Sequence, residues 1–275
     1  MAGNVGIALG PLFTTILLMI LDWRTVTFIL ALPALFAVVL QLWISFDEVR
    51  SQDSQNTEGS AERVQFQINS ISDFSTQLKH LFGFGFFLVF IVVLLNGLYY
   101  RGILTFLPEV LRSMPVLEPL VWAGQTIESH RFLYSGMFLI GILGQYLGGR
   151  ITDYFSPLWL WMLFLPLFPV ISLLYIPAAA GGLWGIIVVS GFLGLFMFMI
   201  QPINQSAVSM FSDTGMRGLA YGCTYLAIFG VGSLGAPMTG YILDWYSINI
   251  LFYVLAAISL LGFLCGFILF WVERN

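Results

Sequence analysis

Long runs without charged residues constrain this chain more than any other feature. Asp, Glu, Lys and Arg are absent from residues 1–21, 25–46, 81–100, 132–149, 154–212, 218–243 and 245–272. A helix needs about 20 apolar residues to cross a bilayer, so most of these runs predict one span each. The run 154–212 is long enough for two spans, and the segment PAAAGG at 177–182 is its strongest break. We therefore expect an all-α polytopic membrane protein with eight transmembrane helices.

The remaining composition excludes several classes of protein. Only 9% of the residues are charged, whereas a soluble domain carries about 25%. This excludes a soluble enzyme and a disordered chain, and the net charge of −4 excludes a nucleic-acid partner. The strands of a membrane β-barrel would alternate over segments of about ten residues, and these runs are too uniformly apolar for that.

Two polar segments interrupt the apolar runs and suggest the domain boundaries. Residues 47–80 read as a cytoplasmic linker, and residues 108–131 as a shorter loop. We expect residues 1–46 to form two helices of an amino-terminal unit, and residues 81–275 to form a six-helix domain. Cationic residues favour one side of the membrane, which predicts a multi-pass protein of the cell membrane with both termini in the cytoplasm. The residues on that side are Arg50, Arg63, Lys79, Arg150, Arg217 and Arg274, against Arg24, Arg112 and Arg131 on the other.

The first and seventh predicted spans share a sequence pattern. Each has a glycine-rich stretch, a proline, the tripeptide Leu-Asp-Trp and a tight turn into an aromatic-rich span. Both pairs of spans cross the membrane in the same sense, so the pattern indicates a parallel repeat. Small residues also let helices approach closely, so the same positions form a candidate helix-packing motif. Its residues are Gly6, Gly10 and Pro11 in the first span, and Gly232, Gly235 and Pro237 in the seventh.

With this repeat and two local motifs, the chain resembles the major facilitator superfamily. Gly10-Pro11 is similar to a motif in the family's fifth helix, and Gly149, Arg150 and Asp153 are similar to the cytoplasmic gating motif after its eighth helix. The resemblance covers the whole chain and aligns its spans with helices five to twelve. It implies a complete carboxyl-terminal half with the first four helices missing. The chain would then be a truncated transporter, or would work with a separate amino-terminal half or as a homodimer. The alternative for residues 149–153 is a plain polar loop with a cytoplasmic arginine.

Polar residues within the third predicted span are candidates for a substrate cavity. Asn96, Tyr99 and Tyr100 lie three and four residues apart, which places them on one helix face. Polar groups at this depth are costly unless they are paired or face water. They line a cavity or form interhelical hydrogen bonds. Arg101 is about 140° around the helix from Asn96, and either reaches the outer headgroups or binds an anionic substrate.

A second polar stripe lies near the end of the sixth predicted span. Gln201, Asn204 and Gln205 follow helical spacing beside Pro202, which is unusual for a lipid-facing surface. They line a water-accessible cavity or bond neighbouring helices. Gln145 and Tyr225 are weaker candidates for the same cavity.

Transport of a small solute by alternating access is the function that these patterns favour, and the resemblance carries most of that inference. The substrate and the energy source cannot be read from the residues. The main alternative is a non-transporting membrane scaffold or assembly partner. An enzyme is not expected, because His80 and His130 lie in or near loops and no span carries paired aspartates. No metal site or cofactor is expected either, and the lipid bilayer is the expected surrounding.

Overall fold

The computed structural model describes residues 9–10, 13–14, 16–43, 71–122 and 125–274. Seven helical segments in these ranges are long and apolar enough to cross a membrane. They correspond to the second through eighth predicted spans, while the first, residues 1–21, lies largely outside the described residues. The seven segments are Trp23–Leu40, Phe84–Arg112, Ser129–Ile151, Pro157–Ala180, Leu183–Met210, Thr214–Trp245 and Ile248–Arg274.

Some of these spans are single helices and others are broken. The single helices are α2 (Trp23–Trp43), α4 (Phe84–Arg112), α5 (Ser129–Ile151), α8 (Leu183–Met210) and α11 (Ile248–Arg274). The fourth candidate span consists of α6 (Pro157–Phe164) and α7 (Leu167–Ala180). The sixth passes through η2 (Thr214–Met216), α9 (Arg217–Tyr225), a π-helical turn η3 (Leu226–Gly230), a 3₁₀ turn η4 (Val231–Leu234) and α10 (Gly235–Trp245). A short helix α3 (Ile71–Leu81) and a hairpin of β1 (Leu120–Trp122) and β2 (Gln125–Ile127) connect the spans.

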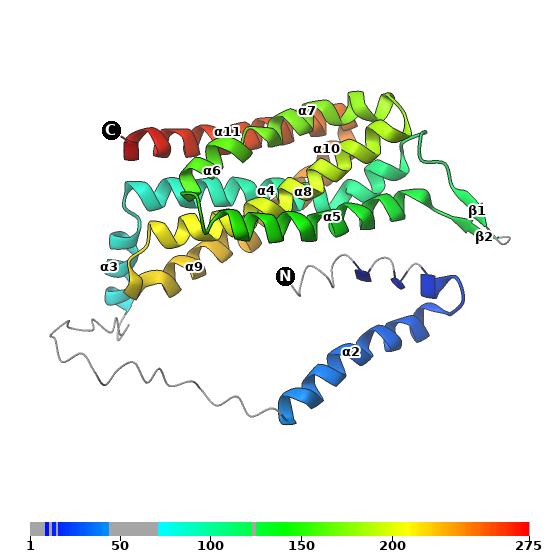
Figure 1. Cartoon of the computed structure of the whole chain (residues 1–275), viewed down its shortest axis with the longest axis horizontal. Coiled ribbons are helices and arrows are strands. Elements are labelled where there is room, and N and C mark those ends of the chain that lie inside the picture. The colour runs from blue at the N-terminus through cyan, green and yellow to red at the C-terminus, as the bar shows by residue number, and fades with distance from the viewer. Residues whose placement is uncertain (1–8, 11–12, 15, 44–70, 123–124, 275) are drawn as a thin grey trace.

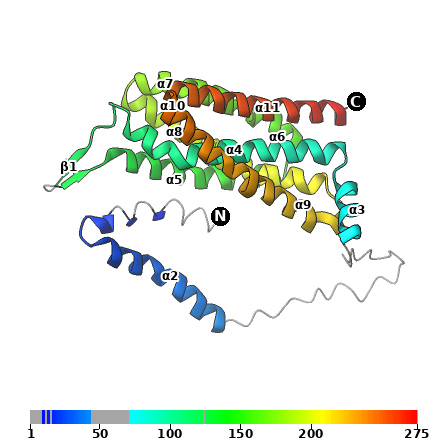
Figure 2. The ribbon, with the colours of Figure 1, turned by 180° about the vertical axis from the view of Figure 1, so that it is seen from behind.

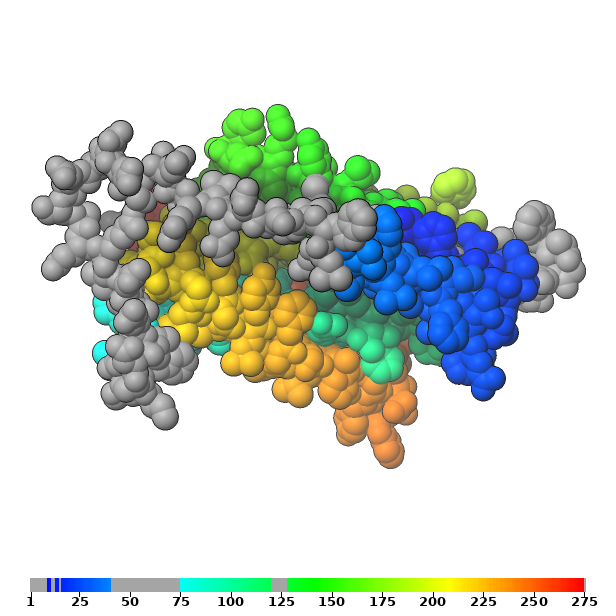
Figure 3. Space-filling view, turned by 90° about the horizontal axis from the view of Figure 1, so that it is seen from below, coloured from blue at the N-terminus to red at the C-terminus, as the bar shows by residue number. Residues whose placement is uncertain are grey.

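Helices α4 to α11 form one bundle, and α2 lies apart from it (Figures 1 and 2). Figure 3 shows the molecule from below, with α2 in blue in front of part of the bundle and the α9–α10 segment in yellow to orange. Within the bundle, α5 packs along α8, α4 packs against α10 and α11, and α7 packs against α8 and α11. The hairpin and the α7–α8 turn lie at one end, and α3 and the carboxyl terminus lie at the other (Figure 1).

The bundle carries apolar side chains on its outside as well as in its core. Trp184, Leu226 and Trp271 are among the large apolar residues that are more than half exposed. In water such a surface would drive aggregation, but in a bilayer it meets lipid chains of equal polarity. The surface therefore fits the membrane environment that the charge-free runs predict.

Glycines allow two parallel helix pairs to pack at backbone distance. A Cβ added at Gly144 or Gly148 of α5 would collide with backbone atoms of α8. Gly232 and Gly235 lie equally close to the backbone of α4 at Gly97 and its neighbours. Close backbone approach of this kind is the usual role of small residues in membrane helix pairs.

The other residues of the candidate helix-packing motif do not make such contacts where they are described. Pro237 is exposed on α10, and a Cβ at Gly10 would meet nothing within 4 Å. Gly6 and Pro11 lie outside the described residues. Of the motif residues that the structure describes, Gly232 and Gly235 alone lie in close contact with a neighbouring helix.

The predicted loop at 108–131 is wrong at its start, because α4 continues through Pro108 to Arg112. Proline has no N–H to donate to the carbonyl four residues earlier, which normally ends or kinks a helix. Here the Leu104 carbonyl that Pro108 leaves free accepts a hydrogen bond of 2.8 Å from the Tyr134 hydroxyl of α5. The neighbouring helix therefore supplies the donor that the proline lacks.

The two Leu-Asp-Trp tripeptides of the predicted repeat have different structural roles. Asp22 precedes α2 and accepts hydrogen bonds from the amides of Arg24 and Thr25 and from the Thr25 hydroxyl. These bonds, the Thr25 hydroxyl first, hold the pKa of the Asp22 carboxyl below its usual value. Asp244 lies inside α10 instead, and Ser247 accepts from the amide of Ile250 at the start of α11.

Candidate functional site

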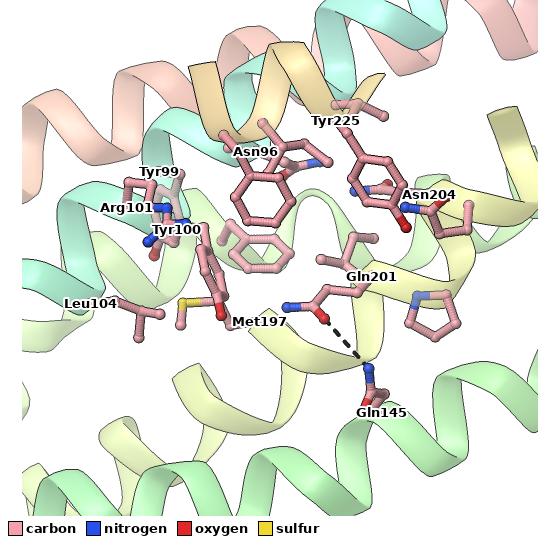
Figure 4. Close-up of a pocket in the computed structure, with 18 of the residues that line it drawn as sticks. Asn96, Tyr99, Tyr100, Arg101, Leu104, Gln145, Met197, Gln201, Asn204 and Tyr225 are labelled. Atoms are coloured by element: carbon pink, nitrogen blue, oxygen red, sulfur yellow. Dashed lines mark hydrogen bonds between the residues drawn. The ribbon is translucent and has the colours of Figure 1, made fainter. Parts of the chain in front are cut away.

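A cavity of about 810 Å³ lies inside the bundle between α4, α5, α7, α8, α9 and η3. All nine residues predicted for a substrate cavity line it, although they come from four separate helices. They are Asn96, Tyr99, Tyr100, Arg101, Gln145, Gln201, Asn204, Gln205 and Tyr225. Figure 4 shows most of their side chains around the same space. The volume is within the range of about 300–1,000 Å³ that is typical of small-molecule sites.

The tyrosines of α4 differ in what they do at this cavity. Tyr99 is buried, its hydroxyl lies 2.9 Å from the Ser172 hydroxyl of α7, and its ring packs edge-on against Phe168. It therefore ties α4 to α7 and presents mainly ring atoms to the space. Tyr100 is only partly buried, and its hydroxyl interacts with the side chain of Gln201 across the cavity.

Asn96 and Arg101 present buried polar atoms that have no hydrogen-bond partner among the described residues. These atoms are the Asn96 Nδ2 and the Arg101 Nε. An unpaired buried donor costs free energy comparable to a lost hydrogen bond. Each donor is therefore available to a bound molecule.

Arg101 lines the same cavity as Asn96, although helical spacing places the two residues on different faces of α4. Its guanidinium carbon lies 5.2 Å from the centre of the Phe229 ring, which belongs to η3. This is within cation–π distance. The long side chain thus turns toward η3. An arginine that reached the lipid headgroups would instead extend along α4 toward the membrane surface.

The amide stripe of α8 is partly committed to the bundle. Asn204 is buried, and its Oδ1 accepts a 2.9 Å hydrogen bond from the Trp161 indole of α6. Gln201 accepts a long bond of 3.5 Å from the Gln145 amide of α5, drawn as the dashed line in Figure 4. The stripe therefore lines the cavity and also bonds α8 to its neighbours. The sequence had left these two roles as alternatives, and the structure shows both.

Several cavity residues were not anticipated from the sequence. Phe229 is stacked on Tyr225, with ring centres 5.9 Å apart, and forms part of the cavity wall beside Arg101 of α4. Tyr134 of α5 also lines the space, through the hydroxyl that bonds the Leu104 carbonyl. Pro108 indicates that the carbonyl it frees needs a donor, but it does not identify Tyr134 as that donor.

The candidate gate residues lie away from this cavity, at the end of α5. Arg150 and Asp153 are exposed, and neither forms an ion pair with another described residue. Gly149 accepts a hydrogen bond from the Thr152 hydroxyl, which closes the end of the helix. The geometry is that of an exposed helix end whose charged groups are available to another surface.

Within the described ranges, no group of three His, Cys, Asp or Glu residues could hold a metal ion. Cys223 and Cys265 are partly buried free thiols and line no part of the cavity.

Comparison with known proteins agrees with the architecture. The family model described as Major Facilitator Superfamily matches residues 1–124 and residues 114–275, which together span the chain. A search of curated proteins gives no match. Proteins of this family are in general transporters and not enzymes. The family match and the apolar spans show that this chain is a multi-pass membrane protein that belongs to the Major Facilitator Superfamily.

Proposed function

We propose that the chain moves a small solute across the membrane by alternating access, with the cavity between α4, α5 and α8 as the substrate site. The observation that carries this proposal is the collection of polar side chains from four helices around one space at membrane depth. Polar groups in such a position are costly, and they most often mark a substrate pathway. Family membership supports transport in general.

We propose that α3 and the carboxyl terminus lie in the cytoplasm, and that the amino terminus lies on the same side. Lys79, Arg150, Arg217 and Arg274 belong to the segments at that end of the bundle. Positive charge concentrates on the cytoplasmic side of membrane proteins. Gly149 and the exposed Arg150 and Asp153 would then form a cytoplasmic gate, which closes against helices that pack on this side of the cavity.

Those further helices are the proposed partner of the bundle. The cavity is lined by residues between Val93 and Phe229, and the described part of residues 1–46 contributes none. Alternating access requires a second rigid unit that can rock against the first. We propose that a separate amino-terminal half, or a second copy of the chain, provides it.

Cysteine accessibility tests the cavity directly. Cys223 and Cys265 are first replaced by alanine, and Asn96→Cys and Gln201→Cys are then introduced singly. Both should react with a membrane-impermeant thiol reagent added to either side of oriented vesicles. Val92→Cys, which is fully buried on α4 away from the cavity, is the control that should stay protected. Protection of both cavity positions from both sides would overturn the proposal.

A flux assay separates a transporter from a scaffold. The purified chain is reconstituted in liposomes, and uptake of labelled solutes is compared with empty liposomes. Saturable uptake supports the transporter. Accessible cavity positions without flux in any oligomeric state would favour the scaffold.

A further inference from the structure

Arg101 is a cation at membrane depth without an acidic partner among the described residues. The ion pairs of the described chain join Arg112 to Glu109 and Arg131 to Glu128, and neither includes Arg101. Its Nε is buried without a hydrogen-bond partner. Arg101 as a whole is partly buried, and a charge at membrane depth is costly unless a counter-charge or strong hydrogen bonds compensate it. A bound anion would supply both.

The immediate surroundings of Arg101 suit an anionic group. Arg101 is the only charged residue among the described residues that line the cavity, so no carboxylate there would repel an anion. The Phe229 ring lies against the guanidinium and restricts its orientation. Asn96 supplies a second donor, the Nδ2 atom, in the wall of the same space. A guanidinium matches the two oxygen atoms of a carboxylate, and the Asn96 amide can donate to another oxygen of the same molecule.

The rest of the cavity suits an apolar body attached to that group. Aromatic rings from α4, α5, α9 and η3 line it, and the lining includes Tyr100, Tyr134, Phe138, Tyr225 and Phe229. A volume of about 810 Å³ is far larger than an inorganic ion needs. Aromatic walls bind flat organic bodies by stacking and edge contacts.

We propose that the cavity binds an organic anion, with its carboxylate on Arg101 and its aromatic body against the tyrosine and phenylalanine rings. The inference names a substrate class for the proposed transport function and rests on it. It predicts that one positive charge selects anions over neutral and cationic molecules of the same shape.

Equilibrium binding of three isosteric probes to the purified full chain tests this inference. The probes are 1-naphthoate, neutral 1-naphthamide and cationic 1-naphthylmethylamine, each radiolabelled and used up to its solubility limit in detergent without phospholipid. Naphthoate should bind saturably and more tightly than the other two. Arg101→Gln should weaken naphthoate binding about tenfold or more, because charge-assisted hydrogen bonds are lost. Arg101→Lys should retain an intermediate affinity, since the charge stays but the planar fork is lost.

Arg112→Gln is the matched control, because it removes the same charge from the same helix at an exposed position outside the cavity. It should leave naphthoate binding unchanged. Each variant is first checked for a monodisperse, helical state. If Arg101→Gln fails that check, the comparison of Arg101→Lys with Arg112→Gln decides the question.

Three results would overturn the inference. These are absent saturable binding of naphthoate, equal affinity for the amine, and a naphthoate affinity that Arg101 substitutions leave unchanged. A lipid phosphate is the other source of an anion, so binding is repeated with added phosphatidylglycerol or phosphatidylcholine. Complete Arg101-dependent displacement of naphthoate by phosphatidylglycerol alone would assign the site to a lipid headgroup. If naphthoate binds through Arg101 but no solute is transported, the anion site is supported and the transport function is not. If other solutes are transported but naphthoate does not bind through Arg101, the transport function is supported and the anion site is not.

Discussion

The contact between α5 and α8 gives a prediction whose sign depends on the position of the glycine. A Cβ at Gly144 would lie 2.9 Å from the carbonyl carbon of Leu195 and 3.1 Å from its Cα, with the carbonyl oxygen nearer still. Carbon atoms pack best at about 3.5–4.0 Å, so Gly144→Ala must push the helices apart by roughly 0.5–1 Å. A Cβ at Gly136, on the same helix, would meet nothing within 4 Å.

The two substitutions should therefore change the free energy of unfolding in opposite directions. Alanine stabilises a helix by about 1 kcal/mol relative to glycine, and Gly136→Ala should gain about that amount. Gly144→Ala should gain the same but lose about 3 kcal/mol, the upper end of the usual overpacking cost, because the obstacle is backbone and not a flexible side chain. We expect a net loss of about 2 kcal/mol and a difference of about 3 kcal/mol between the variants.

Reversible unfolding of the purified chain in mixed micelles, followed by far-ultraviolet circular dichroism as the fraction of denaturing detergent rises, measures both values. Gly148→Ala should behave like Gly144→Ala, because a Cβ there would lie 3.0 Å from the Met199 carbonyl carbon. Equal stability of Gly144→Ala and Gly136→Ala would refute the reasoning, since it would mean that α5 and α8 are not in backbone contact.

Three further predictions concern single hydrogen bonds. Tyr134→Phe should lower the free energy of unfolding by about 1 kcal/mol, because the Leu104 carbonyl loses its donor. The loss should be smaller in a Pro108→Ala background, where residue 108 regains an N–H for that carbonyl. A double-mutant cycle in the same unfolding assay measures the coupling. Trp161→Phe should cost about 1–3 kcal/mol by leaving the buried Asn204 oxygen without its donor, and adding Asn204→Leu should recover part of the loss; full additivity would contradict this. Because folding lowers the pKa of Asp22, its capping bonds should persist above the usual value of 3.8 and be lost as the pH falls through the lowered pKa; the protection of the first-turn amides of α2 against hydrogen exchange, relative to the intrinsic rate at each pH, should then fall, but not in Asp22→Ala.

The spans were predictable because they depend on the local composition of the sequence and not on contacts with distant residues. A bilayer requires long uncharged segments whatever their neighbours are, and seven of the eight expected spans coincide with helical segments of the described chain. The end of α4 was not predictable, since Pro108 ends a helix unless another residue bonds the free carbonyl. That residue is Tyr134, and nothing in the local sequence of α4 indicates its position.

Helical spacing located the cavity residues but not their separate roles. Gln201, Asn204 and Gln205 share a face of α8, and spacing alone predicts that they lie together. It does not show that Asn204 is held by an indole of α6 while Gln201 faces the open space. For Arg101, spacing left open whether the side chain reaches the headgroups or the cavity, because spacing fixes the direction of a Cβ and not the end of a long, flexible side chain.

The packing of α4 against the segment Thr214–Trp245 and the chemistry of the cavity depend on the same close approach of two backbones. A Cβ at Gly97 would lie 2.9 Å from the Ile228 Cα, and one at Gly232 would lie 3.0 Å from the Gly97 carbonyl carbon. This approach holds the π-helical turn η3 against α4, and η3 carries the Phe229 ring that lies against Arg101. A larger residue at Gly97 would therefore move η3 away and remove the aromatic wall from the cation, although Gly97 itself has no polar group to offer a ligand. It follows that residues which only set helix spacing determine the geometry of this site as much as the polar residues that face the cavity.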